Sequence, residues 1–183
     1  MRITGGNARG VSLTVPRAQR VRPTSDRVRS ALFQLLGLVV VDARVLDLYA
    51  GTGALGIEAL SRGAASVDFV EANPRLCDIV ARNMRAAGFE QIGRVYRAKV
   101  DQALEFLTGP YQLILLDPPY ALPGVDRTMN KLAGAGLTEK GGLVAFEHSA
   151  RVPLAESYGT LHTLDSRRYG DTAISIYSVG DAS

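Results

Sequence analysis

The 183-residue chain has little cysteine and histidine, the residues that build disulfides and many metal sites: it contains one cysteine and two histidines. Tryptophan is absent. A single cysteine excludes an internal disulfide framework and a thiolate-rich metal site. Cys77 lies in the helical pattern "PRLCDIVARN", where we expect a small buried thiol and not a nucleophile. His148 and His162 have no acidic residues at ligand spacing, so we expect structural roles for both and no metal centre.

Long apolar runs are also missing. No segment approaches the roughly 20 apolar residues that cross a bilayer, and the N-terminal "MRITGGNARG" lacks the apolar core of a secretory signal. Hydrophobic residues make up 46% of the chain and charged residues 21%, as in ordinary globular proteins. We therefore expect a cytoplasmic protein without membrane contacts, built from one main domain and at most a small appendage.

Positive charge is unevenly distributed along the chain. The formal net charge is only +3, yet residues 1–30 contain seven arginines, no lysine and a single acid, so their local charge is +6 and that of the remainder is −3. Arginine binds phosphates in a bidentate geometry. The segment is therefore predicted to contact phosphates, and a solvated, partly disordered basic tail is the alternative.

The N-terminal segment differs in pattern from the rest of the chain. Residues 1–22 hold two brief β-prone runs around the turn-forming "GGNARG", which predicts a β-hairpin extension. In "PTSDRVRSALFQLLG", Thr24 or Ser25 can cap a helix that ends before Gly37. We therefore divide the chain into an extension over 1–22 and a main domain over 23–183.

From Ala43 onward, apolar strand patterns alternate with helical ones. Strands are expected over 43–50, 66–71, 93–98, 111–117 and 141–148, and helices over 54–62, 73–88, 101–107 and 125–136. Residues 159–179 give two further strand-like runs around Gly170, which indicates an antiparallel hairpin. The alternation predicts an α/β fold with a doubly wound, mostly parallel sheet.

A glycine-rich loop lies between the first strand and the first helix of this domain. The stretch "LDLYAGTGALGIEAL" contains Gly51, Gly53 and Gly56, spaced G-x-G-x-x-G. Glycines allow a tight turn and a close approach of the backbone to a ligand at the helix N-terminus. The pattern fits a dinucleotide site and a nucleoside site equally well, and a loop without a ligand is the structural alternative.

Three acidic residues near successive strand ends distinguish a nucleoside site from a dinucleotide site. Asp47 precedes Gly51 by four residues, where its charge would repel a pyrophosphate but would tolerate a sulfonium and an amino acid. Glu71 ends the second strand and could bind ribose hydroxyls, while Asp101 follows the third and could accept from an adenine amino group. The set favours S-adenosylmethionine over NAD.

The fourth strand ends in "DPPY", residues 117–120. Ligands of open parallel sheets bind at the carboxyl ends of the strands, so this stretch is expected beside the glycine loop. Pro118 and Pro119 hold a rigid backbone without N–H donors, and Asp117 together with the Pro118 carbonyl can accept from an exocyclic amine of a planar base. Tyr120 offers a ring on which that base can stack. A strand-ending turn with a packed tyrosine is the structural alternative.

At these residues the chain resembles the bacterial 16S rRNA guanine-N2 methyltransferases, which are Rossmann-like enzymes that use S-adenosylmethionine. The resemblance rests on "MRITGGNARG", "RPTSDRVRSALF", "LDLYAGTGALGIEALSRGA", "FVEANP", "LLDPPY" and "YGDTAISIY", and so covers nearly the whole chain. The first two segments are the more specific, because "DPPY" also occurs in other exocyclic-amine methyltransferases of DNA, RNA and protein.

The resemblance implies roles for individual residues. Asp117, Pro118, Pro119 and Tyr120 would form the catalytic stretch around the guanine, and the implied cofactor residues are Thr24, Asp47, Tyr49, Gly51, Gly53, Glu71, Ala72, Asn73, Val100, Asp101 and Asp117. The adenine contact stays open between Val100 and Asp101, because Gln102-Ala103 stands where relatives tend to have Asp-Ala. RNA would be bound by five arginines of the extension, Arg2, Arg9, Arg17, Arg20 and Arg22, and by Arg27 in the segment that follows it.

The expected activity is therefore methyl transfer from S-adenosylmethionine to N2 of a guanine in 16S rRNA, by a monomer that acts on the rRNA or on a small-subunit assembly intermediate. An exocyclic-amine methyltransferase of another RNA or DNA base is one alternative. An NAD(P)-dependent oxidoreductase and a non-catalytic RNA-binding module are the others. The oxidoreductase would need a separate substrate domain, for which the chain has little room.

Overall fold

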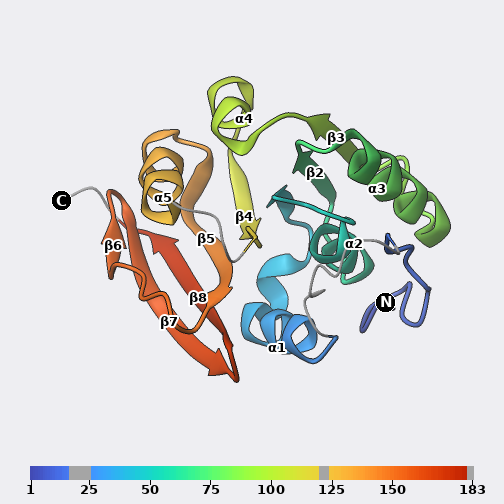
Figure 1. Cartoon of the computed structure of the whole chain (residues 1–183), viewed down its shortest axis with the longest axis horizontal. Helices are drawn as coiled ribbons and strands as arrows, with labels where there is room; N and C mark the ends of the chain where they lie inside the picture. Colours follow the sequence, from blue (N-terminus) through green and yellow to red (C-terminus); the bar gives the residue numbers. More distant parts are fainter. Residues whose placement is uncertain (17–25, 120–123, 181–183) are drawn as a thin grey trace.

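The computed structural model describes residues 1–16, 26–119 and 124–180 (Figure 1). Its strands are β1 (Arg44–Leu48), β2 (Ser66–Glu71), β3 (Gly93–Arg97), β4 (Tyr111–Leu116), β5 (Thr138–Ser149), β6 (Ser157–Tyr158), β7 (Leu161–Tyr169) and β8 (Thr172–Val179). Its helices are α1 (Asp26–Leu36), the 3-10 helix η1 (Gly37–Val40), α2 (Ala54–Ser61), α3 (Pro74–Ala87), α4 (Val100–Phe106) and α5 (Val125–Gly134).

Within these residues the strands form one eight-stranded sheet in the order β3-β2-β1-β4-β5-β8-β7-β6. The first five strands in this order are parallel to one another, and β8, β7 and β6 continue the sheet in antiparallel pairs. The predicted fold class, a doubly wound and mostly parallel sheet with an antiparallel C-terminal hairpin, is confirmed. Two short elements were not predicted, η1 and β6.

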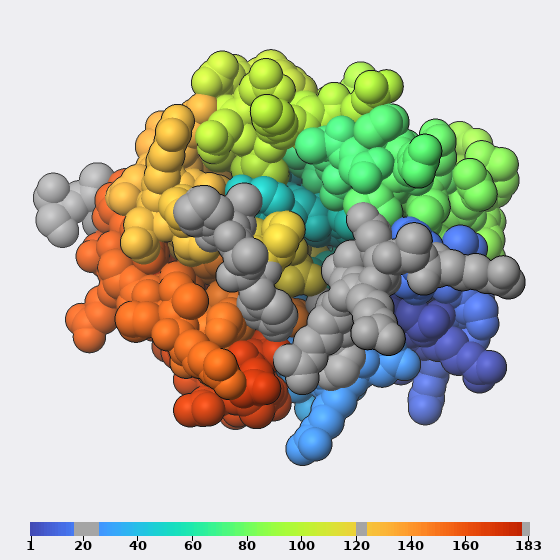
Figure 2. All heavy atoms as spheres, viewed as in Figure 1, coloured from blue at the N-terminus to red at the C-terminus, as the bar shows by residue number. Residues whose placement is uncertain are grey.

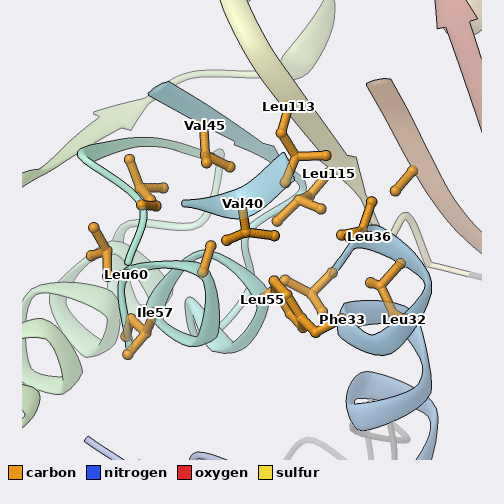
Figure 3. Close-up of a cluster of buried hydrophobic side chains, with 14 of the residues drawn as sticks. Leu32, Phe33, Leu36, Val40, Val45, Leu55, Ile57, Leu60, Leu113 and Leu115 are labelled. Atoms are coloured by element: carbon orange, nitrogen blue, oxygen red, sulfur yellow. The ribbon is translucent and has the colours of Figure 1, made fainter. Parts of the chain in front are cut away.

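Both faces of the sheet are covered, because β1 and β4 are apolar at nearly every position. Val45, Leu113 and Leu115 face α1 and α2 in a cluster that also contains Leu32, Phe33 and Leu55 (Figure 3). The residues that alternate with them, such as Leu46 and Leu116, pack on the other face against α4 and α5. Alternate side chains of a strand point to opposite faces, so a continuous apolar run is what a central strand requires.

The third helix begins and ends at the residues that its sequence indicates. Asn73 caps α3, with its side-chain oxygen accepting from the Arg75 N–H at 2.9 Å, and Pro74 occupies the first helical position. Gly88 ends the helix in the left-handed conformation at φ 80°. The cap at Asn73 and the proline at position 74 fix the first turn of α3 next to the end of β2.

The N-terminal extension packs on the main domain although it forms little regular structure. The predicted hairpin is reduced to a single antiparallel bridge between Arg2 and Ser12, and the predicted boundary at 22/23 lies outside the described residues. Ile3 and Leu13 are buried in the core cluster. At the end of α2, the Asn7 N–H donates to the Ser61 carbonyl at 2.7 Å.

A buried ion-pair network joins the extension, α1 and α2. The Glu58 carboxylate is fully buried and accepts from Arg29 Nε at 3.2 Å, Arg62 Nε at 2.8 Å and the Thr4 N–H at 2.8 Å. The Arg29 guanidinium is also fully buried and donates to the Arg2 carbonyl and to Asp26. Arg29 therefore stabilises the fold, and it is the one described arginine of residues 1–30 whose side chain is not exposed.

No helix among the described residues is both long enough and apolar enough to cross a membrane.

The network predicts unequal effects for substitutions of buried Arg29 and of its exposed partner Asp26. Arg29→Met keeps the apolar stem but leaves buried Glu58 with fewer donors, so we expect a loss of about 3 kcal/mol in the free energy of unfolding. Asp26→Ala removes an exposed partner and should cost less than about 1 kcal/mol. Urea unfolding of both variants tests this, and equal losses would contradict a central role for the Arg29–Glu58 pair.

Candidate active site

Neighbouring parallel strands bring three sequence segments to one edge of the sheet. Leu48, near the end of β1, is paired with Val70 of β2 and with Leu116 of β4. The residues that follow these positions, which include Glu71 and Asp117, must therefore lie side by side. Figure 2 shows blue-green atoms of the β1–α2 region beside yellow atoms of the segment that follows β4. The glycine loop and the "DPP" stretch thus share one rim.

The glycine loop uses left-handed backbone angles to turn from β1 into α2. Tyr49 has φ 62°, Gly51 has φ 57° and Gly53 has φ 79°. A Cβ on Gly53 would also lie 3.0 Å from Val80 Cγ1 of α3. Position 53 therefore requires glycine for both conformation and space, and the loop passes closely over α3.

The Glu71 carboxylate is fixed by two backbone donors. Its Oε2 accepts from the Gly51 N–H at 2.9 Å and its Oε1 from the Asn73 N–H at 2.7 Å. Glu71 is partly exposed, and an ionised carboxylate can accept more bonds than these two. It therefore holds the loop and the start of α3 together and can still accept from the hydroxyls of a ligand.

Asp47 lies beneath the loop and not on its surface. It is 1% exposed, and its Oδ2 accepts from the Gly56 N–H in α2 at 2.9 Å. Burial raises the pKa of Asp47 to about 8, the Gly56 bond opposes this shift, and the nearby charges of Asp117 and Glu71 add to it. The sequence argument treated Asp47 as a charged carboxylate beside the loop. In the folded protein it supports α2 from inside, and its interactions with Asp117 and Glu71 show that the three carboxyl groups are close.

The inner side of α3 carries a polar residue that the sequence analysis did not single out. Asn83 is 1% exposed, and its Nδ2 donates to the Thr52 carbonyl of the glycine loop at 2.9 Å. The same side chain exchanges hydrogen bonds with the backbone of Thr14, at 2.7 and 3.1 Å. Asn83 thus connects the N-terminal extension to the loop. The signal in the sequence was an asparagine on the otherwise apolar stripe of Ile79, Val80 and Met84.

Tyr49 and the two adenine candidates lie toward α4 and α5. The Tyr49 hydroxyl is 3.3 Å from Thr128 Oγ1 in α5, and burial raises the pKa of Tyr49, to which the charge of Asp101 contributes. The Asp101 side chain is 44% exposed and lies 3.9 Å from Arg127 Nη2. Val100 is buried at the start of α4. Of the two candidates, Asp101 is therefore the one that solvent or a ligand can reach.

A shallow apolar hollow, partly open to solvent, lies beside the "DPP" stretch. Its lining residues are Tyr49, Leu116, Pro118, Val125, Thr128, Met129 and Phe146. The contributions of α5 and β5 were not foreseen, although residues 125, 128 and 129 have the helical spacing of a buried face. This hollow adjoins the rim that carries Asp117.

The remaining predicted site residues are placed as follows. Asp117 is partly buried and Pro118 is buried. Six of the predicted residues are exposed, namely Pro119, Ala72, Asn73, Arg2, Arg9 and Arg27. Five of the predicted residues lie outside the described part of the chain, namely Thr24, Tyr120, Arg17, Arg20 and Arg22. The structure therefore brings together the loop, Glu71 and Asp117, while the roles of the exposed arginines remain predictions.

The other reactive side chains have structural surroundings. The Cys77 thiol is partly buried and donates to the Glu71 carbonyl at 3.3 Å, and burial raises its pKa, which disfavours the thiolate. Buried His148 has its Nε2 2.9 Å from Ser175 Oγ, whereas His162 is exposed. Residues 1–16, 26–119 and 124–180 contain no group of three histidine, cysteine or acidic residues that could hold a metal ion.

The raised pKa of Asp47 predicts a pH-dependent stability. An aspartate in the unfolded chain ionises near pH 4, whereas folded Asp47 keeps its proton up to about pH 8. Because the folded state then binds more protons, its stability falls as pH rises through this window. Asp47→Asn mimics the protonated form, so its advantage over the wild type should grow by at least about 1.4 kcal/mol, the value of one pKa unit, between pH 5 and pH 8. Urea unfolding at both values measures this, and a difference independent of pH would contradict the assignment.

Comparison with known proteins shows which chains are similar to this one in sequence and in structure. The family described as "Conserved hypothetical protein 95" matches residues 1–178. Ribosomal RNA small subunit methyltransferase D of Escherichia coli strain K12 is 35% identical over 167 residues, which cover 88% of this chain and 82% of that protein. The putative rRNA methyltransferase YlbH of Bacillus subtilis is 33% identical over 181 residues, which cover 97% of this chain and 98% of that protein. The solved structure of Escherichia coli yhhF superposes with a TM-score of 0.88 at 31% identity, with 100% of this chain and 99% of that chain covered.

Proposed function

Because the chain belongs to the methyltransferase family that includes ribosomal RNA small subunit methyltransferase D, we propose that it transfers a methyl group from S-adenosylmethionine to the exocyclic N2 of a guanine in 16S rRNA. The observation that carries this proposal is the shared rim, where Asp117 and Pro118 follow β4 directly beside the glycine loop that follows β1. A donor held by the loop and a base held at Asp117 would be neighbours.

The residues of the rim fit the donor. The glycine loop offers a close backbone approach at positions 51 and 53, and the fixed carboxylate of Glu71 can accept from ribose hydroxyls. Asp101, exposed at the start of α4, would accept from the adenine amino group. A cationic group above the loop would be favoured by the nearby carboxyl groups of Glu71 and Asp117, whereas buried Asp47 keeps its proton and contributes no charge. S-adenosylmethionine supplies a methyl group that its sulfonium already activates, so the enzyme needs no covalent nucleophile.

The "DPPY" stretch would hold the acceptor. The Asp117 carboxylate and the Pro118 carbonyl would accept hydrogen bonds from the guanine amino group and so direct its nitrogen lone pair toward the methyl group. The same bonds favour the positive charge that develops on nitrogen during transfer. Tyr120 would stack on the base and offset the few kcal/mol that unstacking from the RNA costs.

The substrate partner would be 16S rRNA or a small-subunit assembly intermediate. Arg2, Arg9 and Arg27 of the N-terminal segment are exposed, and arginines at the surface can contact RNA phosphates. One copy of the chain contains every element of the proposed site, so we propose that the enzyme acts as a monomer.

Mapping of methylated nucleosides tests the proposed function. Small-subunit rRNA from cells without this gene should lack one N2-methylguanine, and expression of the wild-type chain should restore it, as measured by mass spectrometry of nuclease fragments. Loss of a methyl group from another base would redirect the proposal to a different acceptor, and an unchanged rRNA would refute it.

Substitution of Asp117 should separate chemistry from cofactor binding. Asp117→Ala removes the acceptor that orients the amine, so we expect methyl transfer to fall at least about 100-fold, the scale of a lost catalytic group. Binding of S-adenosylhomocysteine should change less than about threefold, because its ribose and methionine contacts lie in other segments. Single-turnover transfer and calorimetry measure the two quantities, and a parallel loss of both would argue against the role of Asp117.

Tyr120 should act through its ring and not through its hydroxyl. Tyr120→Phe keeps the stacking surface and should leave transfer within a fewfold of the wild type. Tyr120→Ala removes a stacking contact of about 1–3 kcal/mol, so kcat/KM for RNA should fall about tenfold or more. A mild effect of Tyr120→Ala in the same assay would exclude stacking as the function of this residue.

A further inference from the structure

A second basic region lies far along the chain from the arginine-rich N-terminus. Residues 74–99 contain six basic side chains and only two acidic ones, so their local charge is +4, compared with +3 for the whole chain. We call the exposed side chains of this region the α3–β3 basic surface. They are Arg75, Arg82, Arg85, Arg94, Arg97 and Lys99, all of them exposed.

The helix contributes its arginines from one side. Arg75, Arg82 and Arg85 are separated by seven and three residues, and this spacing places them along one stripe of a helix. Buried Val80 and Met84 lie on the opposite side of α3. The arginine stripe therefore faces away from the core along the whole of α3.

The strand contributes its arginines from the edge of the sheet. β3 is the terminal strand and pairs with β2 only. Met84 packs so closely on the start of β3 that a Cβ on Gly93 would lie 2.1 Å from its sulfur atom. Because side chains alternate along a strand, Arg97 shares the face of Gly93, and its charge acts on Cys77 in the first turn of α3. Arg94 points to the opposite face of the edge strand, where its guanidinium lies 4.9 Å from the centre of the Tyr96 ring. The basic side chains therefore extend from α3 over Arg97 and around the edge of the sheet.

The charges of this surface are not neutralised within the described part of the chain. None of the ion pairs found there involves any of the six residues, and the two acids of the region are Asp78 and Glu90. At the other end of the sheet, by contrast, Arg167 is paired with Asp165 at 3.0 Å and Arg151 with Asp171 at 3.7 Å.

The basic surface is continuous with the proposed active site and with the N-terminal extension. α3 starts at Asn73, whose N–H donates to Glu71 at the rim, and Asn83 of the same helix binds the backbone of Thr14 in the extension. β3 and β4 are three strand spacings apart in the sheet, about 14 Å at roughly 4.8 Å per spacing. One RNA strand covers that distance in roughly four nucleotides at about 3.4 Å each.

We propose that the α3–β3 basic surface binds the phosphates of RNA that flanks the target nucleotide, as a second contact region besides the N-terminal arginines. The proposal rests on the RNA substrate proposed above. RNA bound at Asp117 would extend over the rim toward β3, attracted by arginines that have no ion pair within the described residues. It would extend away from the β7 end of the sheet, where Arg151 and Arg167 are paired with acids.

Two triple variants of equal charge test this surface. Arg82→Gln, Arg85→Gln and Arg94→Gln together remove three positive charges from the basic surface. Arg151→Gln, Arg167→Gln and Arg168→Gln remove three exposed arginines from the other end of the sheet. Binding of 16S rRNA isolated from cells without the gene is measured between about 50 and 250 mM salt, a range of about fivefold that includes physiological ionic strength. Binding of S-adenosylhomocysteine reports whether the cofactor site is intact.

The first variant should bind RNA at least about tenfold more weakly near 100 mM salt, with a salt slope smaller by about two, since each phosphate contact contributes roughly 0.7 to 0.9. The second should change the slope by less than about one, and both should retain the affinity for S-adenosylhomocysteine. Equal losses in the two variants, or no loss in the first, would overturn the proposed surface. If the wild type restores N2-methylguanine in cells while the first variant binds RNA normally, only the surface fails and the proposed function stands.

Discussion

The parallel pairing of β1 with β4 is the constraint on which the rest of the site depends. The pairing of Leu48 with Leu116 ends both strands at the same level, so the glycine loop and the "DPP" stretch meet although they are far apart in sequence. The pairing is stable because both strands are buried on two faces, against α1 and α2 on one side and α4 and α5 on the other. A shift of the register by one residue would exchange these faces and separate the two halves of the site.

The rim concentrates carboxyl groups, and the protein accommodates them in different ways. Glu71 is held by two backbone N–H groups and stays accessible, whereas Asp47 is buried and its pKa is raised. The consequence is a rim with negative potential above a neutral, protonated support. Such a rim suits a ligand that carries positive charge, and it contrasts with the basic residues of the N-terminal segment and of α3 and β3 that surround it. Charge thus divides this surface into an acidic rim and a basic periphery, to which the proposed function assigns the methyl donor and the RNA.

The sequence predicted those elements whose signals are local. The apolar run of β4 and the cap and stop of α3 at Asn73 and Gly88 were read from residue type and spacing, and the structure confirms them. β6 was missed because two residues give no pattern, and the predicted N-terminal hairpin has one bridge because its apolar side chains pack into the core instead of onto each other.

The strand pairing confirms that the two predicted segments are neighbours, whereas the surroundings of individual side chains differ from those predicted. Strand order placed the glycine loop near Asp117, but burial decided the state of Asp47, and burial depends on contacts that no local pattern reports. The same holds for Arg29, which belongs to an arginine-rich segment and yet forms a buried pair with Glu58. Asn83 and the α3–β3 basic surface emerged only when helix and strand were packed together.

A structure of the complex with S-adenosylhomocysteine tests the central claim most directly. The account predicts that the ribose hydroxyls contact the Glu71 carboxylate, that the methionine part follows residues 51–53, and that the sulfur faces the backbone at 117–118. A ligand bound at another edge of the sheet, or with its sulfur directed away from β4, would contradict it.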